Sequence, residues 1–194
     1  MIRRPPRSTL MRSSAASECI RDRLANLIGQ KRRDKINRML HTIMAFGLIA
    51  GVILMGLGML SAKPILEVSG TPESVMNEAL LYIRIYFIGI PFMMIYNFGS
   101  AVLRSFGDTR RPMYYLILSG TVNVILNLIL VIYFKLGVAG VAIATVISNI
   151  LSAGLVLIYL YRREDEFQFR PQRLHIEKED LKKVLVIGIP AGIQ

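Results

Sequence analysis

Charged residues are missing from four long stretches of this sequence, and this pattern constrains the fold more than any other feature. The stretches without Asp, Glu, Lys or Arg are residues 39–62, 85–103, 112–134 and 136–161. The first has 24 residues and would form a helix about 36 Å long, more than the roughly 30 Å hydrocarbon core of a bilayer. The pattern therefore predicts an all-α, polytopic transmembrane helix bundle with four full spans.

Composition supports a membrane protein and argues against several other classes. Hydrophobic residues make up 53% of the chain and the mean hydropathy is +0.48, which is too apolar for a typical soluble domain. Cys19 is the single cysteine, so the sequence predicts no disulfide framework and no thiolate metal cluster, and we expect no metal or cofactor. The net charge of +11 is concentrated in the loops, so we expect a lipid bilayer and not nucleic acid as the partner.

The two ends differ from the interior. Residues 1–23 are rich in Arg and Ser without a helical period, which is typical of a disordered basic arm or a transit peptide. They also resemble the peptide obtained when a sequencing adaptor is translated in frame with a gene fragment, so we expect a non-native or disordered segment. Residues 182–194 end within the first turns of a new apolar run, which we interpret as the start of a fifth span. We therefore expect a fragment that is inactive alone.

Basic residues predict the orientation. Five lie in residues 31–38, three in 104–111 and seven in 162–183, whereas the opposite side holds three, Lys63, Arg84 and Lys135. Because cytoplasmic loops are enriched in Lys and Arg, we predict that the loop at 24–38, the loop at 104–111 and the linker at 162–181 are cytoplasmic. Residues 63–78 and the turn at 135–140 then face outward.

Polar and helix-weakening residues within the spans mark candidate functional positions. Pro91 removes one backbone hydrogen bond and Gly89 lies beside it, which predicts either a hinge or a static kink. Asn123 and Asn127 are four residues apart and share one helix face near mid-bilayer. Such amides need partners, so they either join helices or line a substrate or cation cavity. Thr145 follows a small-residue surface in the fourth span, where its hydroxyl can bond its own helix.

Several motifs taken together resemble the multidrug and toxic compound extrusion (MATE) transporters. They are the GIP helix around Pro91, the loop LRSFGDTRRP at 103–112, the Asn-x-x-x-Asn helix, the GVAGVAIAT helix and the GIPAGIQ run at 188–194. The resemblance covers about residues 24–194 and implies helices three to six of a twelve-helix protein, plus the start of helix seven. It implies two six-helix bundles around a cavity that opens alternately to each side, with residues 39–161 in the amino-terminal lobe.

The resemblance also implies a function. Such proteins are multi-pass antiporters of the cell membrane that export cationic or amphipathic compounds in exchange for H⁺ or Na⁺; they are not enzymes, and we expect a monomer at full length. Members with a cation site in the amino-terminal lobe use an Asn and, four residues on, an Asp or Asn from helix five, and a Thr from helix six. Asn123, Asn127 and Thr145 match these places. An Asn at the second place disfavours protonation on this helix and leaves Na⁺ coupling, or coupling elsewhere, open.

Two other functions are alternatives to a small-molecule exporter. A lipid-linked oligosaccharide flippase of the same superfamily is favoured by a cavity lined with several Arg, yet Arg84 is the single Arg near a span interior. An intramembrane enzyme needs a nucleophile, a base or metal ligands at depth, and the four stretches contain no Asp, Glu or Cys. We therefore expect a small-molecule substrate.

Overall fold

The computed structural model describes residues 33–162, which form four long helices. These are α2 (Arg33–Val68), α3 (Glu73–Ser105), α4 (Arg110–Leu128), which is continued by the π-helix η1 (Ile129–Tyr133), and α5 (Gly137–Arg162). All four are long and apolar enough to cross a membrane, which confirms the predicted all-α transmembrane bundle. The predicted basic segment at 1–23, nearly all of the linker at 162–181 and the start of a fifth span at 182–194 lie outside the described residues.

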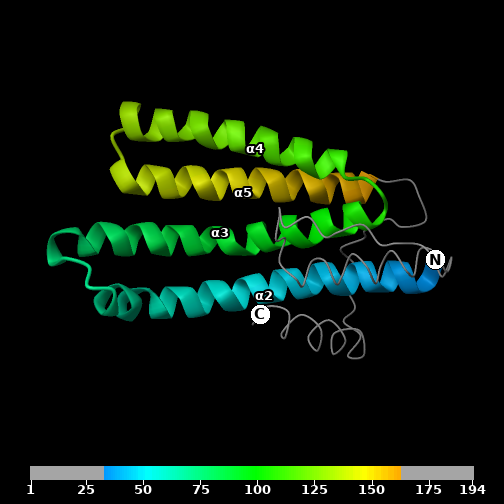
Figure 1. The fold of residues 1–194 in the computed structure, drawn as a ribbon, viewed down its shortest axis with the longest axis horizontal. Helices are drawn as coiled ribbons and strands as arrows, with labels where there is room; N and C mark the ends of the chain where they lie inside the picture. Colours follow the sequence, from blue (N-terminus) through cyan, green and yellow to red (C-terminus); the bar gives the residue numbers. More distant parts are fainter. Residues whose placement is uncertain (1–32, 163–194) are drawn as a thin grey trace, which may run out of the picture.

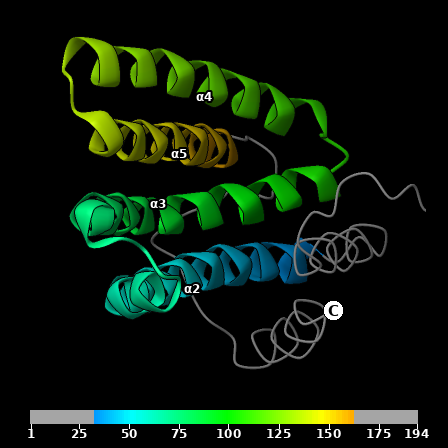
Figure 2. The same ribbon diagram turned by 60° about the vertical axis from the view of Figure 1, so that its left-hand side comes forward.

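The helices alternate in direction and lie in a row in the order α2, α3, α5, α4 (Figure 1; Figure 2). The α2–α3 and α4–α5 connections lie at one end of the bundle and the α3–α4 connection at the other (Figure 1). Helix α3 packs against both α2 and α5, whereas α4 packs mainly against α5. Successive connections therefore lie at opposite ends of the bundle, which agrees with the alternation between basic and less basic loops in the sequence.

Glycines allow α2 and α3 to approach closely. A Cβ on Gly51 would lie 2.6 Å from the Cα of Pro91, and a Cβ on Gly47 would overlap the ring of Phe98. The neighbour of Gly51 is backbone, so no rotamer change can make room for a side chain there. The Gly47–Gly51 spacing thus marks a helix–helix contact, as small residues in a spanning helix predict.

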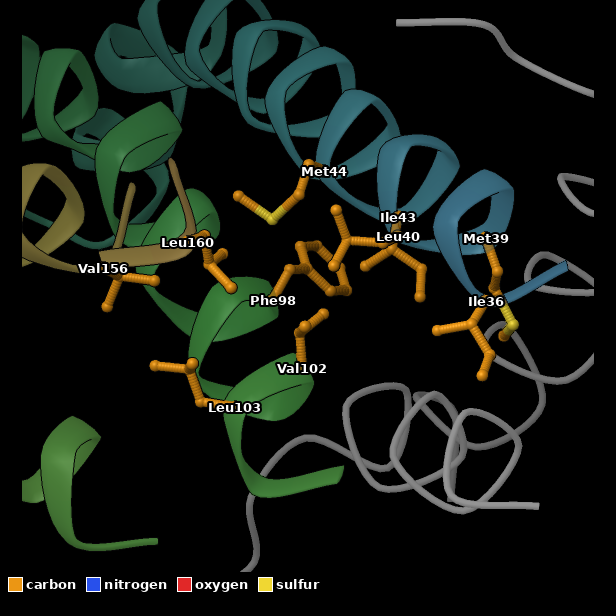
Figure 3. Packing of buried hydrophobic residues seen from close by; sticks show 10 residues of the cluster. All are labelled: Ile36, Met39, Leu40, Ile43, Met44, Phe98, Val102, Leu103, Val156 and Leu160. Carbon is orange, nitrogen blue, oxygen red and sulfur yellow. The ribbon is translucent and has the colours of Figure 1, made fainter. Parts of the chain in front are cut away.

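An apolar core joins α2, α3 and α5 near the end of the bundle that carries the α3–α4 connection (Figure 3). Its side chains come from the start of α2 and from the last turns of α3 and α5: Ile36, Met39, Leu40, Ile43, Met44, Phe98, Val102, Leu103, Val156 and Leu160. Phe46 packs edge to face on Phe98, with ring centroids 5.9 Å apart. Toward the other end of α2, large side chains such as Leu57 and Leu60 are exposed, as expected of a surface that faces lipid or further helices.

The helix ends differ from the ends of the charge-free stretches. Helix α2 begins at Arg33, inside the segment 24–38 that was predicted as a loop, and continues through Lys63 and Pro64 to Val68. The connection to α3 is therefore residues 69–72 and not 63–78. Lys63 and Glu67 lie one turn apart with N···O 3.7 Å, and such i,i+4 pairs support a helix in a polar environment. The first charged residue after the apolar stretch therefore indicates where the hydrocarbon core ends and not where the helix ends.

Candidate cation and substrate site

The predicted site residues of α4 and α5 come together where the second half of α4 packs against the first half of α5. The amide nitrogen of Asn127 donates to Oδ1 of Asn123 at 3.0 Å, within α4. Nδ2 of Asn123 lies 3.5 Å from Oγ1 of Thr145, on α5. All three residues are half-buried. The pair that shares a face of α4 therefore faces α5, and its partner there is the predicted threonine.

Ser148 belongs to the same group, and the sequence reasoning missed it. Its Oγ accepts from Nδ2 of Asn123 at 3.2 Å, a shorter distance than the one to Thr145, and only 7% of the residue is exposed. Ser148 follows Thr145 by three residues, so the i,i+3 spacing on one helix face was the available signal. Asn123, Asn127, Thr145 and Ser148 are named the polar cluster below.

The hydrogen bonds of the polar cluster run in one direction. Thr145 Oγ1 donates to the Val141 carbonyl at 2.9 Å, and Ser148 Oγ donates to the Thr145 carbonyl at 2.8 Å. A hydroxyl has a single proton, so both oxygens can only accept from the amide of Asn123. The Oδ1 of Asn123 accepts in turn from Asn127.

This series of bonds ends at Oδ1 of Asn127. The atom is buried and has no hydrogen-bond partner among the described residues. A buried acceptor in this state costs about 1–3 kcal/mol, and an unsatisfied group of this kind in a native protein needs an explanation. Hard cations take amide oxygens as ligands, and a polar group of a small molecule can donate to one. The polar cluster therefore offers a ligand atom that no residue in the described part of the chain uses.

The backbone beside the polar cluster departs from α-helical geometry. The π-helix η1 begins at Ile129, two residues after Asn127, and single π-helical turns within α-helices are frequent at functional sites. Leu130 in this turn packs on α5, where a Cβ on Gly140 would lie 3.1 Å from the Leu130 Cβ. The small residue at position 140 thus lets α5 approach α4 closely next to the cluster.

The predicted hinge residues lie on α3, between its two neighbours. Gly89 and Pro91 are both buried, and α3 continues through them as one helix. Gly89 faces α5, where its Cβ would lie 3.3 Å from Nδ2 of Asn149, and Pro91 faces Gly51 of α2. A bend at this point would change both helix contacts at once. The hinge role stays a prediction.

The chemistry of the site is that of neutral atoms. Within residues 33–162 there is no group of three or more His, Cys, Asp and Glu side chains that could hold a metal ion. The polar cluster contains amide and hydroxyl groups, which do not titrate near neutral pH. It can bind a monovalent cation through oxygen, or a polar group of a small molecule through hydrogen bonds.

Comparison with known proteins decides the family. The sequence model of the MatE family matches residues 8–129, which is more than half of the chain. The chain belongs to the MatE family. The match includes Asn123 and Asn127, while Thr145 and Ser148 of the polar cluster lie beyond it.

Curated relatives of this MatE chain are longer than it is. The Bacillus subtilis protein named "Probable multidrug resistance protein YoeA" is 35% identical over 172 residues, which cover 85% of this chain and 37% of the relative. The "Multidrug export protein MepA" of Staphylococcus saprophyticus is 27% identical over 168 residues, with 87% and 37% covered. This chain therefore spans well under half of the length of these relatives.

Solved MATE structures share the helix arrangement. A MATE protein in the bent conformation gives a TM-score of 0.86 at 21% identity, covering 93% of this chain and 41% of that chain. An outward-facing MATE transporter of the MOP superfamily gives 0.83, with 93% of this chain and 40% of that chain covered. A MOP superfamily transporter from Pyrococcus furiosus, whose title suggests a different function from a binding pocket of reversed polarity, also gives 0.83, with the same coverage. At 21% identity these structures show the fold alone and do not decide the substrate.

Proposed function

We propose that this MatE chain supplies amino-terminal-lobe helices of a cell-membrane antiporter, which exports cationic or amphipathic compounds in exchange for H⁺ or Na⁺. The observation that carries the proposal is the buried Oδ1 of Asn127, which has no partner within residues 33–162 and ends a hydrogen-bond series between two spanning helices. Membership of the MatE family and the names of the relatives, which are multidrug export and resistance proteins, support it.

In this proposal the polar cluster contacts the coupling cation or a polar group of the substrate. Oδ1 of Asn127 is the first ligand, and the oxygens of Asn123 and Thr145 lie next to it in the hydrogen-bond series. A bound cation removes the cost of the unpaired acceptor. Neutral oxygen ligands suit Na⁺ better than H⁺, because none of these groups gains or loses a proton near neutral pH. Coupling to H⁺ at this site requires a carboxylate from a helix other than α2 to α5.

A small-molecule exporter agrees better with the described helices than a flippase for lipid-linked oligosaccharides. The cluster is neutral, and the arginines of α3 are engaged or lie at the surface. Arg104 donates to Oγ of its own-helix neighbour Ser100 at 2.8 Å, and Arg84 is exposed. The arginines of α3 therefore form no surface of the kind that binds a pyrophosphate-linked sugar.

The test is removal of each asparagine amide in the full-length gene product. Asn123→Ala and Asn127→Ala should insert and express normally, because a polar contact between spanning helices contributes only about 0.6–2 kcal/mol. Ion-coupled export in proteoliposomes should fall by about tenfold or more, which corresponds to about 1.4 kcal/mol of lost cation or substrate binding. Thr121→Ala is the matched control, since Thr121 lies exposed on the same helix and bonds to the Ile117 carbonyl. Normal export by both asparagine variants would reduce the pair to a packing role.

A further inference from the structure

The loop between α3 and α4 carries a set of contacts that the proposed function does not use. Gly107, with φ +83°, turns the chain, and the backbone N–H of Asp108 donates to the Leu103 carbonyl of α3 at 3.1 Å. The carboxylate of Asp108 then accepts twice from Arg111: from its backbone N–H at 3.2 Å and from its Nη1 at 2.9 Å. Asp108 therefore joins the end of α3 to the first turn of α4.

The charge of Asp108 has a second role at this helix end. The first turn of α4 contains Arg110 and Arg111 and no acidic residue. Positive charges at a helix N-terminus oppose the helix dipole, whereas a carboxylate there is stabilising. Thr109, the residue directly before α4, makes no side-chain capping bond, so Asp108 supplies both the cap and the compensating charge.

Arg111 continues the connection to α5. Its guanidinium carbon lies 4.3 Å from the ring centroid of Tyr159, within the range of a cation–π contact. A planar guanidinium can stack on a ring while its edge donates to a carboxylate, which a lysine ammonium cannot do in the same geometry. The hydroxyl of Tyr96 on α3 donates to the Pro112 carbonyl of α4 at 2.9 Å. Three helices are thus joined at one corner of the bundle.

Within residues 33–162, few side chains of α4 are buried. Pro112 and Ser119 are its buried residues there, whereas eight residues of α5 are buried. In this part of the chain, the specific contacts of α4 and its continuation η1 with α5 are the corner at Arg111, the polar cluster and the Leu130–Gly140 contact. Arg111 and Asn123 are twelve residues apart, about 18 Å along the helix, so the corner fixes the line that α4 follows toward the cluster.

We propose that Asp108, Arg111 and Tyr159 anchor α4 to α5 and thereby hold Asn123 within hydrogen-bond reach of Thr145 and Ser148. Asp108 orients Arg111 through their hydrogen bonds, and the guanidinium of Arg111 stacks on the ring of Tyr159. All three are positioning residues for the polar cluster. The contacts described above are the whole evidence for the anchor itself. The expected effect of the anchor on coupling-ion binding rests, in addition, on the proposed function.

Hydrogen–deuterium exchange of the full-length gene product tests the anchor without any transport assay. Arg111→Gln, Asp108→Asn and Tyr159→Leu should speed exchange of α4 backbone amides by about two- to fivefold, while amides of α2 stay unchanged. Tyr159→Phe keeps the ring and should behave as the parent protein. Arg110→Gln removes the same charge from the neighbouring arginine, for which no contact with Asp108 or Tyr159 is described, and should not speed α4 exchange.

The outcomes separate the anchor from the proposed function. Unchanged α4 exchange in Arg111→Gln and Tyr159→Leu would overturn the anchor, and Asp108→Asn with Tyr159→Leu decides the matter if Arg111→Gln does not fold. In proteoliposomes, Tyr159→Leu should raise the coupling-ion concentration for half-maximal export by about threefold or more, with Tyr159→Phe restoring the parent value. Faster α4 exchange with an unaltered half-maximal concentration would refute the positioning role. Normal export by both Asn123→Ala and Asn127→Ala would remove the polar cluster from the proposed function and leave the exchange result on the anchor valid.

Discussion

Asn127 carries an amide nitrogen where aspartate has a second oxygen, and that nitrogen determines the direction of the hydrogen bonds in the polar cluster. It donates to Oδ1 of Asn123, which leaves the Asn127 oxygen as the free acceptor. A protonated carboxyl at this place can make the same donation, whereas an ionised one cannot and sets two oxygens against each other. The residue type at position 127 therefore determines whether the site responds to protons.

Asn127→Asp should make export depend on pH in a way that the parent protein does not. At low pH the neutral acid keeps the bond to Asn123, and at high pH its ionisation breaks this bond and adds a negative charge beside the cation. The measurement is initial export rate in proteoliposomes between about pH 5 and pH 8, the range in which a partly buried carboxyl can titrate. Asn127→Leu, which has similar volume and no polar atom, is the control and should be weak at every pH. Parent-like pH profiles for both variants would show that position 127 does not contact the ion.

Part of this site could be predicted from the sequence, and the reason is helical spacing. Four residues place Asn123 and Asn127 on one face, and amides in hydrocarbon must find partners. The free oxygen could not be predicted, because it follows from the direction in which the Thr145 and Ser148 hydroxyls donate. Whether the amide of Asn123 meets these hydroxyls depends on how α4 is rotated against α5, and spacing within one helix contains no such information.

At the level of helices, small residues indicated the helix–helix contacts correctly, whereas charged residues did not indicate where a helix ends. The Gly47–Gly51 spacing lies at the α2–α3 contact, and Gly140 lies at the α4–α5 contact. The charge-free stretch, in contrast, placed the end of α2 at residue 62, six residues before its observed end at Val68. A spanning helix continues into the headgroup region, where polar residues are tolerated. The absence of charged residues therefore indicates which part of a helix lies in the hydrocarbon core, whereas small residues indicate where two helices pack together.

The α2–α3 contact yields a prediction with a matched pair of glycines on the same helix. Gly51→Ala should destabilise the bundle by about 1–3 kcal/mol, because the new methyl group would lie 2.6 Å from the Pro91 backbone. Gly56→Ala should be neutral or stabilising by up to about 1 kcal/mol, because no atom lies within 4 Å of its Cβ and alanine is the better helix former. Thermal unfolding of the two variants in detergent measures the difference. Similar midpoints for both would mean that α3 does not press on α2 at Pro91.

For the molecule as a whole, the number of spans could be predicted and their lateral order could not. Every face of a spanning helix is apolar, so the hydrophobic period that assigns an inward face in a soluble helix is lost. The row α2, α3, α5, α4 (Figure 2) instead follows side-chain shape, with Gly51 against Pro91 on one side of α3 and Gly99 against Val156 on the other. Such complementarity between distant segments is not visible in one sequence.

The side of the membrane on which each connection lies remains a prediction, and it can be tested on the full-length gene product. With the single Cys19 replaced by Cys19→Ser, the exposed positions Ser69 and Thr109 each receive one cysteine, as Ser69→Cys and Thr109→Cys. They lie on connections at opposite ends of the bundle (Figure 1). Because the loop at 104–111 carries three basic residues and lies beside the basic linker in the predicted topology, it should be cytoplasmic.

Ser69→Cys should therefore react with a membrane-impermeant maleimide in intact cells, and Thr109→Cys should react only after the membrane is permeabilised. Both positions are exposed in the structure, so a difference between them reports sidedness and not burial. Labelling of denatured protein serves as the control for expression. The reverse pattern would invert the bundle in the membrane and place the anchor of α4 at the outer face. Equal labelling of both positions in intact cells would mean that the connections do not lie on opposite sides, which is incompatible with four full spans.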